Sequence, residues 1–378
     1  MPEIHPLDDA AEEPTTIEDN VLDDVDPDEE VIPESAFNIT SWGLDLDVRG
    51  IVSKLEDEDI IIPSFYPQFV PEDGDLQIQG FQREFVWKRP QMDKFIESLL
   101  LGLPVPGIFL VRQPNNRLLV LDGQQRLQTL KLYYDGLWRD KVYRLKGVDS
   151  RFSNLAYSEL EQGDRRQLDL GVIHATILRQ DDDDGYQDAI YSIFERLNTG
   201  GSVLRPQEIR VALYHGKLLD AIAKTSADPI WSNVYGTAPT RFKDHELILR
   251  VLAFYGNADG YQAPLKTFLN HFLKDHRDDS KTIEVLELFR RALGLSFDAL
   301  GKSAFRRDRA LNAAIFDSVM AALMQRLASG AEVLCQEDFR SKYRTLLADD
   351  DYMKSVTATT NHSSSVATRM KLAREAFQ

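Results

Sequence analysis

Two short apolar segments, a turn and a helix follow one another directly within residues 107–136. This succession constrains the fold more than any other feature of the sequence. The segments 107–113 and 118–121 are apolar, and Pro114-Asn115-Asn116 lies between them. Two apolar runs around such a turn predict a β-hairpin. A helix with one apolar face follows the second run and is expected to end at Gly136. We therefore expect a small sheet with a helix entering directly from one of its strands.

The charge of the chain is distributed unevenly, which changes what its net value of −17 implies. Residues 1–35 contain fourteen Asp or Glu and no Lys or Arg, leaving 47 acidic and 44 basic residues elsewhere. We expect this acidic segment to be disordered, because it has too little apolar surface to offset the entropy of ordering. Such tails most often serve solubility. The alternative is an autoinhibitory tail that mimics DNA and occupies a basic groove.

The remaining chain is predicted to form an α+β protein, with a small α/β domain over residues 36–228 and an α-helical domain over 229–378. Apolar spacing and end signals indicate which residues form each element. The predicted helices of the first domain lie at 47–54, from Pro90 to about residue 101, after Asp122, at 186–197 and from Pro206. Its further strands are predicted at 59–63, 76–78 and 172–178. Apolar stripes at 245–254, 283–293, 310–327 and 339–347 predict the helices of the second domain.

Three absences in the sequence suggest a cytoplasmic protein. No stretch of 18 apolar residues could span a membrane. The acidic N-terminus lacks the pattern of a secretion signal. Cys335 is the single cysteine, so neither a disulfide framework nor a cysteine-based zinc site is expected. Its leucine-rich helical context favours a buried structural cysteine.

The strand at 118–121 runs directly into Asp122-Gly123-Gln124-Gln125-Arg126, which we call the DGQQR loop. The N-terminus of a helix offers unpaired N–H groups and a partial positive charge, which suit a phosphate. Gly123 would let the backbone approach a ligand closely, and Arg126 could grip phosphate oxygens. Asp122 could cap the helix, hold Mg²⁺ or orient water. An ordinary cap and turn explain the pattern equally well.

Two further segments combine polar and structural residues. Phe81–Trp87 places Gln82-Arg83-Glu84 among aromatic residues, so Arg83 is either an ion-pair partner or a ligand clamp. The segment Phe194–Gly201 contains the polar residues Arg196, Asn198 and Thr199 and two adjacent glycines, and it precedes a helix. Such a loop can line a ligand site, although an ordinary helix–helix connection has the same composition.

Four segments in this order carry a resemblance to a known family: FQREFVW, IESLLLGLPVPGIFL, VLDGQQRLQTL, and FERLNTGG with RPQEIRVALYHG. Together they closely resemble the N-terminal domain family of GmrSD restriction endonucleases, over roughly Ile60 to Gly216. The stretch from Thr360 to Arg374 also looks like the helical C-terminal end of that family. The resemblance implies a core similar to ParB and sulfiredoxin, whose equivalent arginine-bearing loop binds nucleotide phosphates. It also implies a bacterial anti-phage system that recognises modified DNA.

The resemblance assigns roles to particular residues. In such proteins the DGQQR loop is associated with NTP hydrolysis and with control of DNA cleavage, so we expect an NTP-binding and NTP-hydrolysing subunit using Mg²⁺. The expected catalytic residues are Asp122, Arg126 and Arg83, with Asp122 also a metal ligand. The expected nucleotide-binding residues are Gln82, Gly123, Gln124, Gln125, Thr129, Arg196, Asn198 and Thr199. The general base stays open between Asp122 and Glu84, and no GxxxxGK[ST] sequence of a Walker A loop occurs.

The chain departs from the family in one respect. Many members carry an HNH nuclease, but none of the seven histidines lies in a convincing HNH pattern. We therefore expect either a separate nuclease subunit or no nuclease at all. The other expected partners are an NTP and DNA, which the family recognises in modified form.

Two alternatives remain at this point. The first is a non-catalytic module that binds DNA or assembles with a nuclease, with Arg306, Arg307 and Arg309 beside Lys302 contacting phosphates. A solvated basic helix end is the ordinary interpretation of that cluster. The second is a ParB-like nuclease, for which Asp181–Asp184 could be offered as a metal site. A solvated acidic turn explains that run better.

Overall fold

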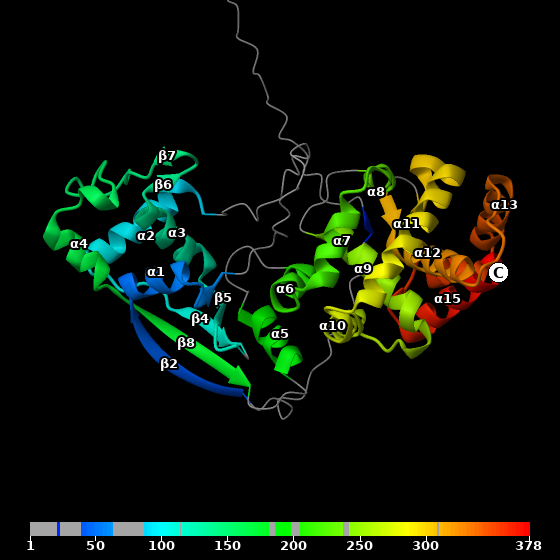
Figure 1. The fold of residues 1–378 in the computed structure, drawn as a ribbon, viewed down its shortest axis with the longest axis horizontal. Coiled ribbons are helices and arrows are strands. Elements are labelled where there is room, and N and C mark those ends of the chain that lie inside the picture. The colour runs from blue at the N-terminus through cyan, green and yellow to red at the C-terminus, as the bar shows by residue number, and fades with distance from the viewer. Residues whose placement is uncertain are drawn as a thin grey trace, which may run out of the picture.

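The computed structural model describes residues 21–22, 39–62, 87–113, 115–180, 186–197, 205–236, 242–307 and 310–378. Figure 1 shows two lobes, one with a small sheet and helices and one almost entirely helical. The predicted α+β class, with a small mixed sheet early in the chain and a helical region after it, is confirmed. No helix within the described ranges is long and apolar enough to cross a membrane.

A five-stranded mixed sheet organises the first lobe, in the order β2-β8-β4-β5-β3. The strands are β2 Ile39–Asp47, β3 Ile60–Ile61, β4 Ile108–Arg112, β5 Leu118–Asp122 and β8 Val172–Gln180. The predicted hairpin is confirmed, because β4 and β5 pair antiparallel with Val111 opposite Leu119. β8 lies parallel to β4, and β3 lies parallel to β5. β5 therefore lies inside the sheet and delivers the DGQQR loop at its carboxyl end.

Strand β2 was not predicted from the sequence. Its nine residues pair antiparallel with β8, from Ile39 opposite Gln180 to Asp47 opposite Val172. The following helix, α1 (Val48–Glu56), begins where Asp47 accepts a hydrogen bond from the Gly50 N–H at 2.7 Å. The helix predicted over 47–54 is thus confirmed, with Asp47 as its cap.

Helices cover one face of the sheet and bury its first core. They are α1, α2 (Arg89–Leu100), α3 (Gln124–Asp135) and α4 (Gln162–Asp169), and a small hairpin of β6 (Leu137–Trp138) and β7 (Lys141–Val142) follows α3. Their buried side chains pack on Ile108, Leu110 and Val120 of the central strands. Pro90 lies in the first turn of α2, and Gly136 ends α3 in the left-handed conformation, as expected.

The opposite face of the sheet packs on the helical lobe. Val111, Leu119, Leu121 and Leu178 share one core with that lobe. Its helices are α5 (Tyr186–Leu197), α6 (Pro206–Leu213), α7 (Lys217–Ser226), α8 (Pro229–Tyr235), α9 (Lys243–Asn257), α10 (Leu265–His276), α11 (Ser280–Leu300), α12 (Ala313–Ala328), α13 (Gln336–Leu347), α14 (Asp350–Ser355) and α15 (Ser363–Phe377). The helices after β8, starting with α5, therefore pack into the core of the helical lobe. This change of core lies earlier in the chain than the domain boundary predicted near residue 228.

A three-stranded sheet of order β1-β10-β9 lies at the start of α12. Its strands are β1 (Val21–Leu22), β9 (Arg306–Arg307) and β10 (Ala310–Asn312). Disorder was expected throughout residues 1–35, but Val21–Leu22 form a strand because the edge of β10 provides backbone partners. The rest of the acidic segment lies outside the described residues.

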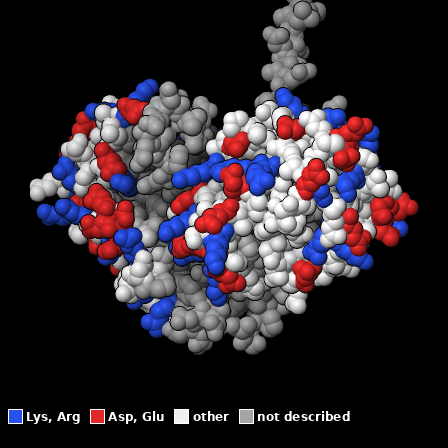
Figure 2. All heavy atoms as spheres, turned by 45° about the vertical axis from the view of Figure 1, so that its right-hand side comes forward, with Lys and Arg blue, Asp and Glu red and all other residues white. Residues whose placement is uncertain are grey.

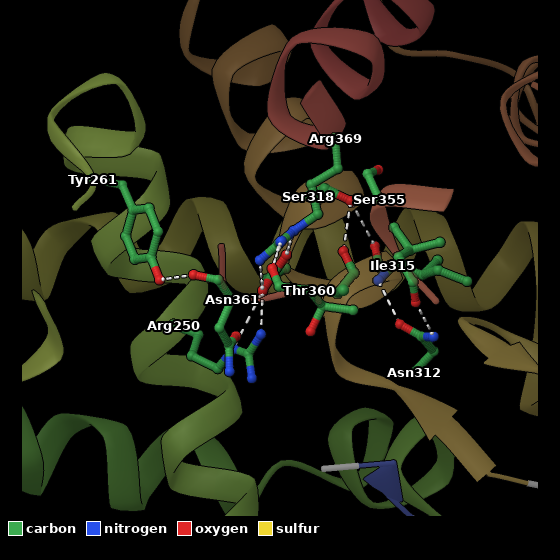
Figure 3. A network of polar contacts seen from close by, with 12 residues as sticks. Arg250, Tyr261, Asn312, Ile315, Ser318, Ser355, Thr360, Asn361 and Arg369 are labelled. Carbon is green, nitrogen blue, oxygen red and sulfur yellow. Dashed lines mark hydrogen bonds and ion pairs between the residues drawn. The ribbon is translucent and has the colours of Figure 1, made fainter. Parts of the chain in front are cut away.

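A buried polar network joins three helices of the helical lobe at Asp317, and Figure 3 labels two of its members, Arg250 and Arg369. The Asp317 carboxylate accepts from Arg250 of α9 at 2.7 Å and from Arg369 of α15 at 3.1 Å. Arg369 also donates to the carbonyl of Thr360, which fixes the segment before α15.

At the surface, acidic and basic side chains are interspersed on the face drawn in Figure 2. That mixture agrees with the nearly neutral charge of the chain outside residues 1–35.

Candidate functional site

The DGQQR loop is a tight connection between β5 and α3. Gly123 is the residue before the helix and has φ 98°, a left-handed conformation that favours glycine. A Cβ atom at this position would lie 2.4 Å from Cγ2 of Ile108 in β4. The predicted turn at Gly123 is confirmed, and its cause is both the backbone conformation and the close approach of the neighbouring strand.

Asp122 and Arg126 form an ion pair across this turn. Nη2 of Arg126 lies 2.7 Å from Oδ2 of Asp122 and also donates to the carbonyl of Gly107 at 2.8 Å. The Arg126 side chain is mostly buried, whereas that of Asp122 is 46 % exposed. Asp122 does not cap α3, because Gly123 occupies the cap position and no side-chain cap hydrogen bond forms. Asp122 therefore fixes the arginine and keeps one face toward solvent.

Two donors of the loop are buried without an acceptor among the described residues. They are Nε of Arg126 and Nε2 of Gln124, whose side chain is only 7 % exposed. A buried donor left unpaired costs about 1–3 kcal/mol. A ligand that brings oxygen acceptors would recover this cost, so the loop has the chemistry of an anion or polar-ligand site.

The backbone at the start of α3 adds donors of its own. Its first hydrogen bond within the turn runs from the Leu127 N–H to the Gly123 carbonyl at 3.0 Å. The amides of the residues before Leu127 have no carbonyl one turn earlier in the helix. Together with the helix dipole, these amides favour a negatively charged ligand.

Gln125 and Thr129 support the loop from within the protein. Oε1 of Gln125 accepts from the backbone N–H of Trp87 at 3.2 Å, so the end of the Phe81–Trp87 segment contacts the loop. Thr129 is fully buried, and its hydroxyl donates to the Gln125 carbonyl at 2.7 Å. In this conformation Thr129 stabilises the helix and has no surface for the nucleotide contact that we expected.

Several predicted site residues lie outside the described residues. These are Gln82, Arg83 and Glu84, the predicted strand at 76–78, Asn198, Thr199, Arg309 and the acidic run Asp181–Asp184. Arg196 is described and is exposed in the last turn of α5. α5 packs against β5, the strand that carries the loop. No hydrogen bond or ion pair between described residues joins Arg196 to the DGQQR loop.

The basic cluster proposed for DNA is arranged differently from the expectation. Nη2 of Arg306 donates to the carbonyls of Val234 and Tyr235 at 2.8 and 2.7 Å, and its Nε donates to the carbonyl of Lys302. Arg306 thus binds the C-terminal end of α8, where a cation is favoured. The Arg306 guanidinium is thus engaged within the protein, and Arg307 is the second residue of β9.

The described residues offer few metal ligands. Among them, no group of three or more His, Cys, Asp or Glu side chains could hold a metal ion. At the DGQQR loop Asp122 is the carboxylate that reaches solvent. Cys335 is exposed, so the expectation that it is buried is wrong. Its sulfur accepts a hydrogen bond from the Asp338 N–H at the start of α13.

Sequence reasoning missed the two residues that shape the floor of the loop. Gly107 accepts from Arg126, and Ile108 fills the space that a side chain at position 123 would need. A Cβ atom on Gly107 would itself lie 2.7 Å from the carbonyl oxygen of His174. The glycine that opens the first strand of the hairpin was the available signal, because a glycine in such a place often marks a close backbone approach.

Comparison with known proteins gives one match. Residues 68–215 match the family model described as GmrSD restriction endonuclease, N-terminal domain. The matched range contains the DGQQR loop, all of α2 to α6 and strands β4 to β8. A search of curated proteins and a search of solved structures find no match.

Proposed function

Residues 68–215 belong to the GmrSD restriction endonuclease N-terminal domain family, and from this premise we propose that the chain is the NTP-binding and NTP-hydrolysing subunit of a bacterial restriction system. The family implies a role in DNA restriction. In this role, nucleotide turnover at the DGQQR loop controls recognition or cleavage of DNA. A separate nuclease subunit cuts the DNA.

The observation that carries the proposal is the pair of unpartnered donors at Gln124 and Arg126. Both belong to one loop, both are buried, and neither has an acceptor among the described residues. Oxygen atoms of a phosphate chain would satisfy them together. Arginine hydrogen bonds to phosphate are charge-assisted and stronger than those between neutral groups.

Gly123 and the first turn of α3 complete the support for a phosphate. The absence of a side chain at Gly123 leaves the backbone open, and the helix dipole adds partial positive charge there. Phosphoryl transfer needs mainly positioning and stabilisation of charge from the protein. Arg126 provides that charge from a position fixed by Gly107.

Mg²⁺ fits the loop as a companion of the nucleotide. Asp122 is the carboxylate present, and one carboxylate together with phosphate oxygens and water is a common set of Mg²⁺ ligands. When bound, Mg²⁺ would neutralise part of the phosphate charge. Asp122 also orients Arg126 through their ion pair, so this carboxylate serves both groups.

The experiment that tests the proposal measures phosphate release by the full chain. Each of the four NTPs is supplied with Mg²⁺, with and without duplex DNA, to the wild type and to Asp122→Ala and Arg126→Ala variants. Lys131→Ala is the matched control, because Lys131 forms an exposed ion pair with Asp135 on the same helix. We expect release by the wild type and the control but not by Arg126→Ala.

Two outcomes would reject this function. If the wild type neither binds nor hydrolyses any NTP, the DGQQR loop is not a nucleotide site. If the chain alone cleaves the DNA, and the same two variants abolish cleavage, the ParB-like nuclease alternative replaces it.

A further inference from the structure

A second pair of unpartnered donors lies at the start of α6, which belongs to the helical lobe (Figure 1). They are Nη1 of Arg205 and Nε2 of Gln207, and neither has a hydrogen-bond acceptor among the described residues. The Gln207 side chain is buried, with 2 % of the residue exposed. An unsatisfied buried polar group calls for an explanation, and a ligand that brings acceptors is one.

Arg205 occupies the cap position of α6, where most helices have an acceptor. A Ser, Thr, Asn or Asp at this position accepts from an N–H of the first turn. A guanidinium has donors only, and Arg205 makes no side-chain cap hydrogen bond. The first hydrogen bond of the turn runs from the Ile209 N–H to the Arg205 carbonyl at 3.2 Å. The N–H of Gln207 precedes this bond and has no carbonyl one turn earlier, so it is a third donor of the same turn.

The free end of the Gln207 amide is directed toward the start of the helix. Oε1 of Gln207 accepts from Nη1 of Arg210 at 3.0 Å, one turn later. Because an arginine cannot accept, this contact fixes which end of the amide is oxygen and leaves Nε2 at the other end. Side chains of a helix lean toward its N-terminus, so Nε2 lies on the side of Arg205. The two side-chain donors and the first-turn N–H therefore converge.

The neighbouring polar groups of α6 are already occupied. Nε of Arg210 donates to Asn270 at 2.9 Å, and its Nη1 donates to Glu246 at 2.7 Å. The carboxylate of Glu208 accepts from the backbone N–H of Arg205 at 2.7 Å. Nη1 of Arg205 finds no carboxylate among the described residues, so its charge is left for a ligand.

We propose that the start of α6 is a second oxyanion site, which binds a phosphate group through Arg205, Gln207 and the first-turn N–H. Phosphate oxygens would accept from all three donors, and their charge suits the N-terminus of a helix. Arg205 is partly exposed, so a ligand reaches the buried amide past this residue. The burial of Gln207 favours inorganic phosphate or a mononucleotide over the backbone of a duplex. The site lies in α6, and it does not depend on nucleotide turnover at the DGQQR loop.

The test measures the melting temperature of the full chain with increasing inorganic phosphate, against chloride of the same ionic strength. Gln207→Glu keeps an acceptor for Arg210 and replaces the free NH₂ group by a negatively charged oxygen. Arg205→Met removes the guanidinium. Arg344→Met is the matched control, because Arg344 is exposed in the last turn of α13, where the helix dipole disfavours an anion. Arg126→Ala shows what the DGQQR loop contributes.

Non-hydrolysable NTP analogues and a 20-bp duplex are tested in the same way, with Arg126→Ala present in every protein. Stabilisation by an analogue at lower concentration than by inorganic phosphate would identify a mononucleotide as the ligand. The opposite order would identify phosphate itself.

We expect phosphate to stabilise the wild type, the Arg344→Met control and Arg126→Ala alike. In Gln207→Glu and Arg205→Met, about tenfold more phosphate or more should be needed for the same rise, because each loses a hydrogen bond to a charged ligand. If Gln207→Glu does not fold, Arg205→Met decides alone.

Three results would overturn the site. The first is a wild type that neither phosphate nor any analogue stabilises beyond chloride. The second is a phosphate response that Arg205→Met retains in full, or that Arg126→Ala alone abolishes, since the phosphate would then bind elsewhere. The third is stabilisation by the duplex alone, lost in both site variants, which would replace the small ligand by nucleic acid. A chain without NTP hydrolysis would leave this site unaffected.

Discussion

Arg126 holds the Asp122 carboxylate at 2.7 Å across the first turn of α3, and the same nitrogen donates to Gly107. This ion pair predicts different roles for the two residues in NTP binding and NTP hydrolysis. Asp122→Ala removes a negative charge beside the phosphates, so NTP binding should persist. Hydrolysis should fall by about 10²–10³, the usual loss when one group that stabilises the transition state is removed or displaced. Arg126→Ala should weaken NTP binding by about tenfold or more and should also lose hydrolysis.

Separate measurements of kcat and of the dissociation constant for the NTP distinguish these two effects. The different roles of the two residues would be refuted if Asp122→Ala weakened NTP binding as much as Arg126→Ala.

Gly123 is predicted to be intolerant of any side chain. Gly123→Ala combines a left-handed backbone, which costs about 1–2 kcal/mol for other residues, with overpacking against Ile108, which costs about 1–3 kcal/mol. Gly136→Ala is the control, because Gly136 has φ 74° but nothing within 4 Å of the added Cβ. Urea denaturation should show a clearly larger loss of unfolding free energy at position 123. Equal losses would mean that Ile108 moves aside.

Asp317 is predicted to be the critical member of the buried network. Asp317→Asn keeps the shape but leaves the buried guanidiniums of Arg250 and Arg369 without the carboxylate that both contact. Breaking a buried pair in this way costs about 3–5 kcal/mol. Arg369→Met leaves Asp317 paired with Arg250 and should cost less. Thermal denaturation of the two variants checks this order, and the reverse order would contradict it.

His245 should make the fold sensitive to mild acid. Burial lowers the pKa of His245 below its usual 6.5, although the nearby Asp244 carboxylate opposes this effect. As the pH falls through 6.5, the unfolded chain binds a proton that the folded chain does not. The free energy of unfolding should therefore fall by up to about 1.4 kcal/mol per pH unit, until the pH reaches the lowered pKa.

The measurement compares the wild type with His245→Gln between pH 7 and pH 5. The variant should lack this part of the acid sensitivity, since a glutamine can still reach the Ser226 hydroxyl that lies 3.0 Å from Nε2 of His245. Parallel pH profiles for both proteins would show that His245 takes up its proton in the folded state.

Local signals in the sequence predicted α1, α2, α3, α5 and the β4–β5 hairpin, but not α4, α7 or the β6–β7 hairpin. Pro90 and Gly136 fix helix ends within one turn, and the apolar run before Asp122 forms the expected strand. Strand β2 was missed although Trp42, Leu44 and Leu46 alternate with polar residues, which is the pattern of a half-buried strand. Its partner β8 lies far along the chain, so no local turn marks the pairing. An antiparallel strand with one solvated face commonly shows such alternation, so this signal was available in the sequence.

The sequence located the turn at Gly123 but not the contacts around it. The residue types at 122–126 led to the prediction of a phosphate site, which stays a prediction, and the pairing of Arg126 depends on Gly107, 19 positions earlier. The contacts of Arg306 could not be predicted from the sequence either, because the carbonyls that it binds at the end of α8 lie 71 and 72 positions away. Partners this distant are determined by packing, which a single sequence does not display.

The most direct test of the proposed nucleotide site is calorimetric titration with a non-hydrolysable analogue of each NTP and Mg²⁺. Wild type and Lys131→Ala should bind one analogue with the same affinity. Gln124→Ala and Arg126→Ala should each weaken that binding by about tenfold or more, because a hydrogen bond to a charged group contributes about 1.5–3 kcal/mol. Binding of no analogue by the wild type, or equal affinity in all four proteins, would contradict the assignment of the DGQQR loop as a nucleotide site.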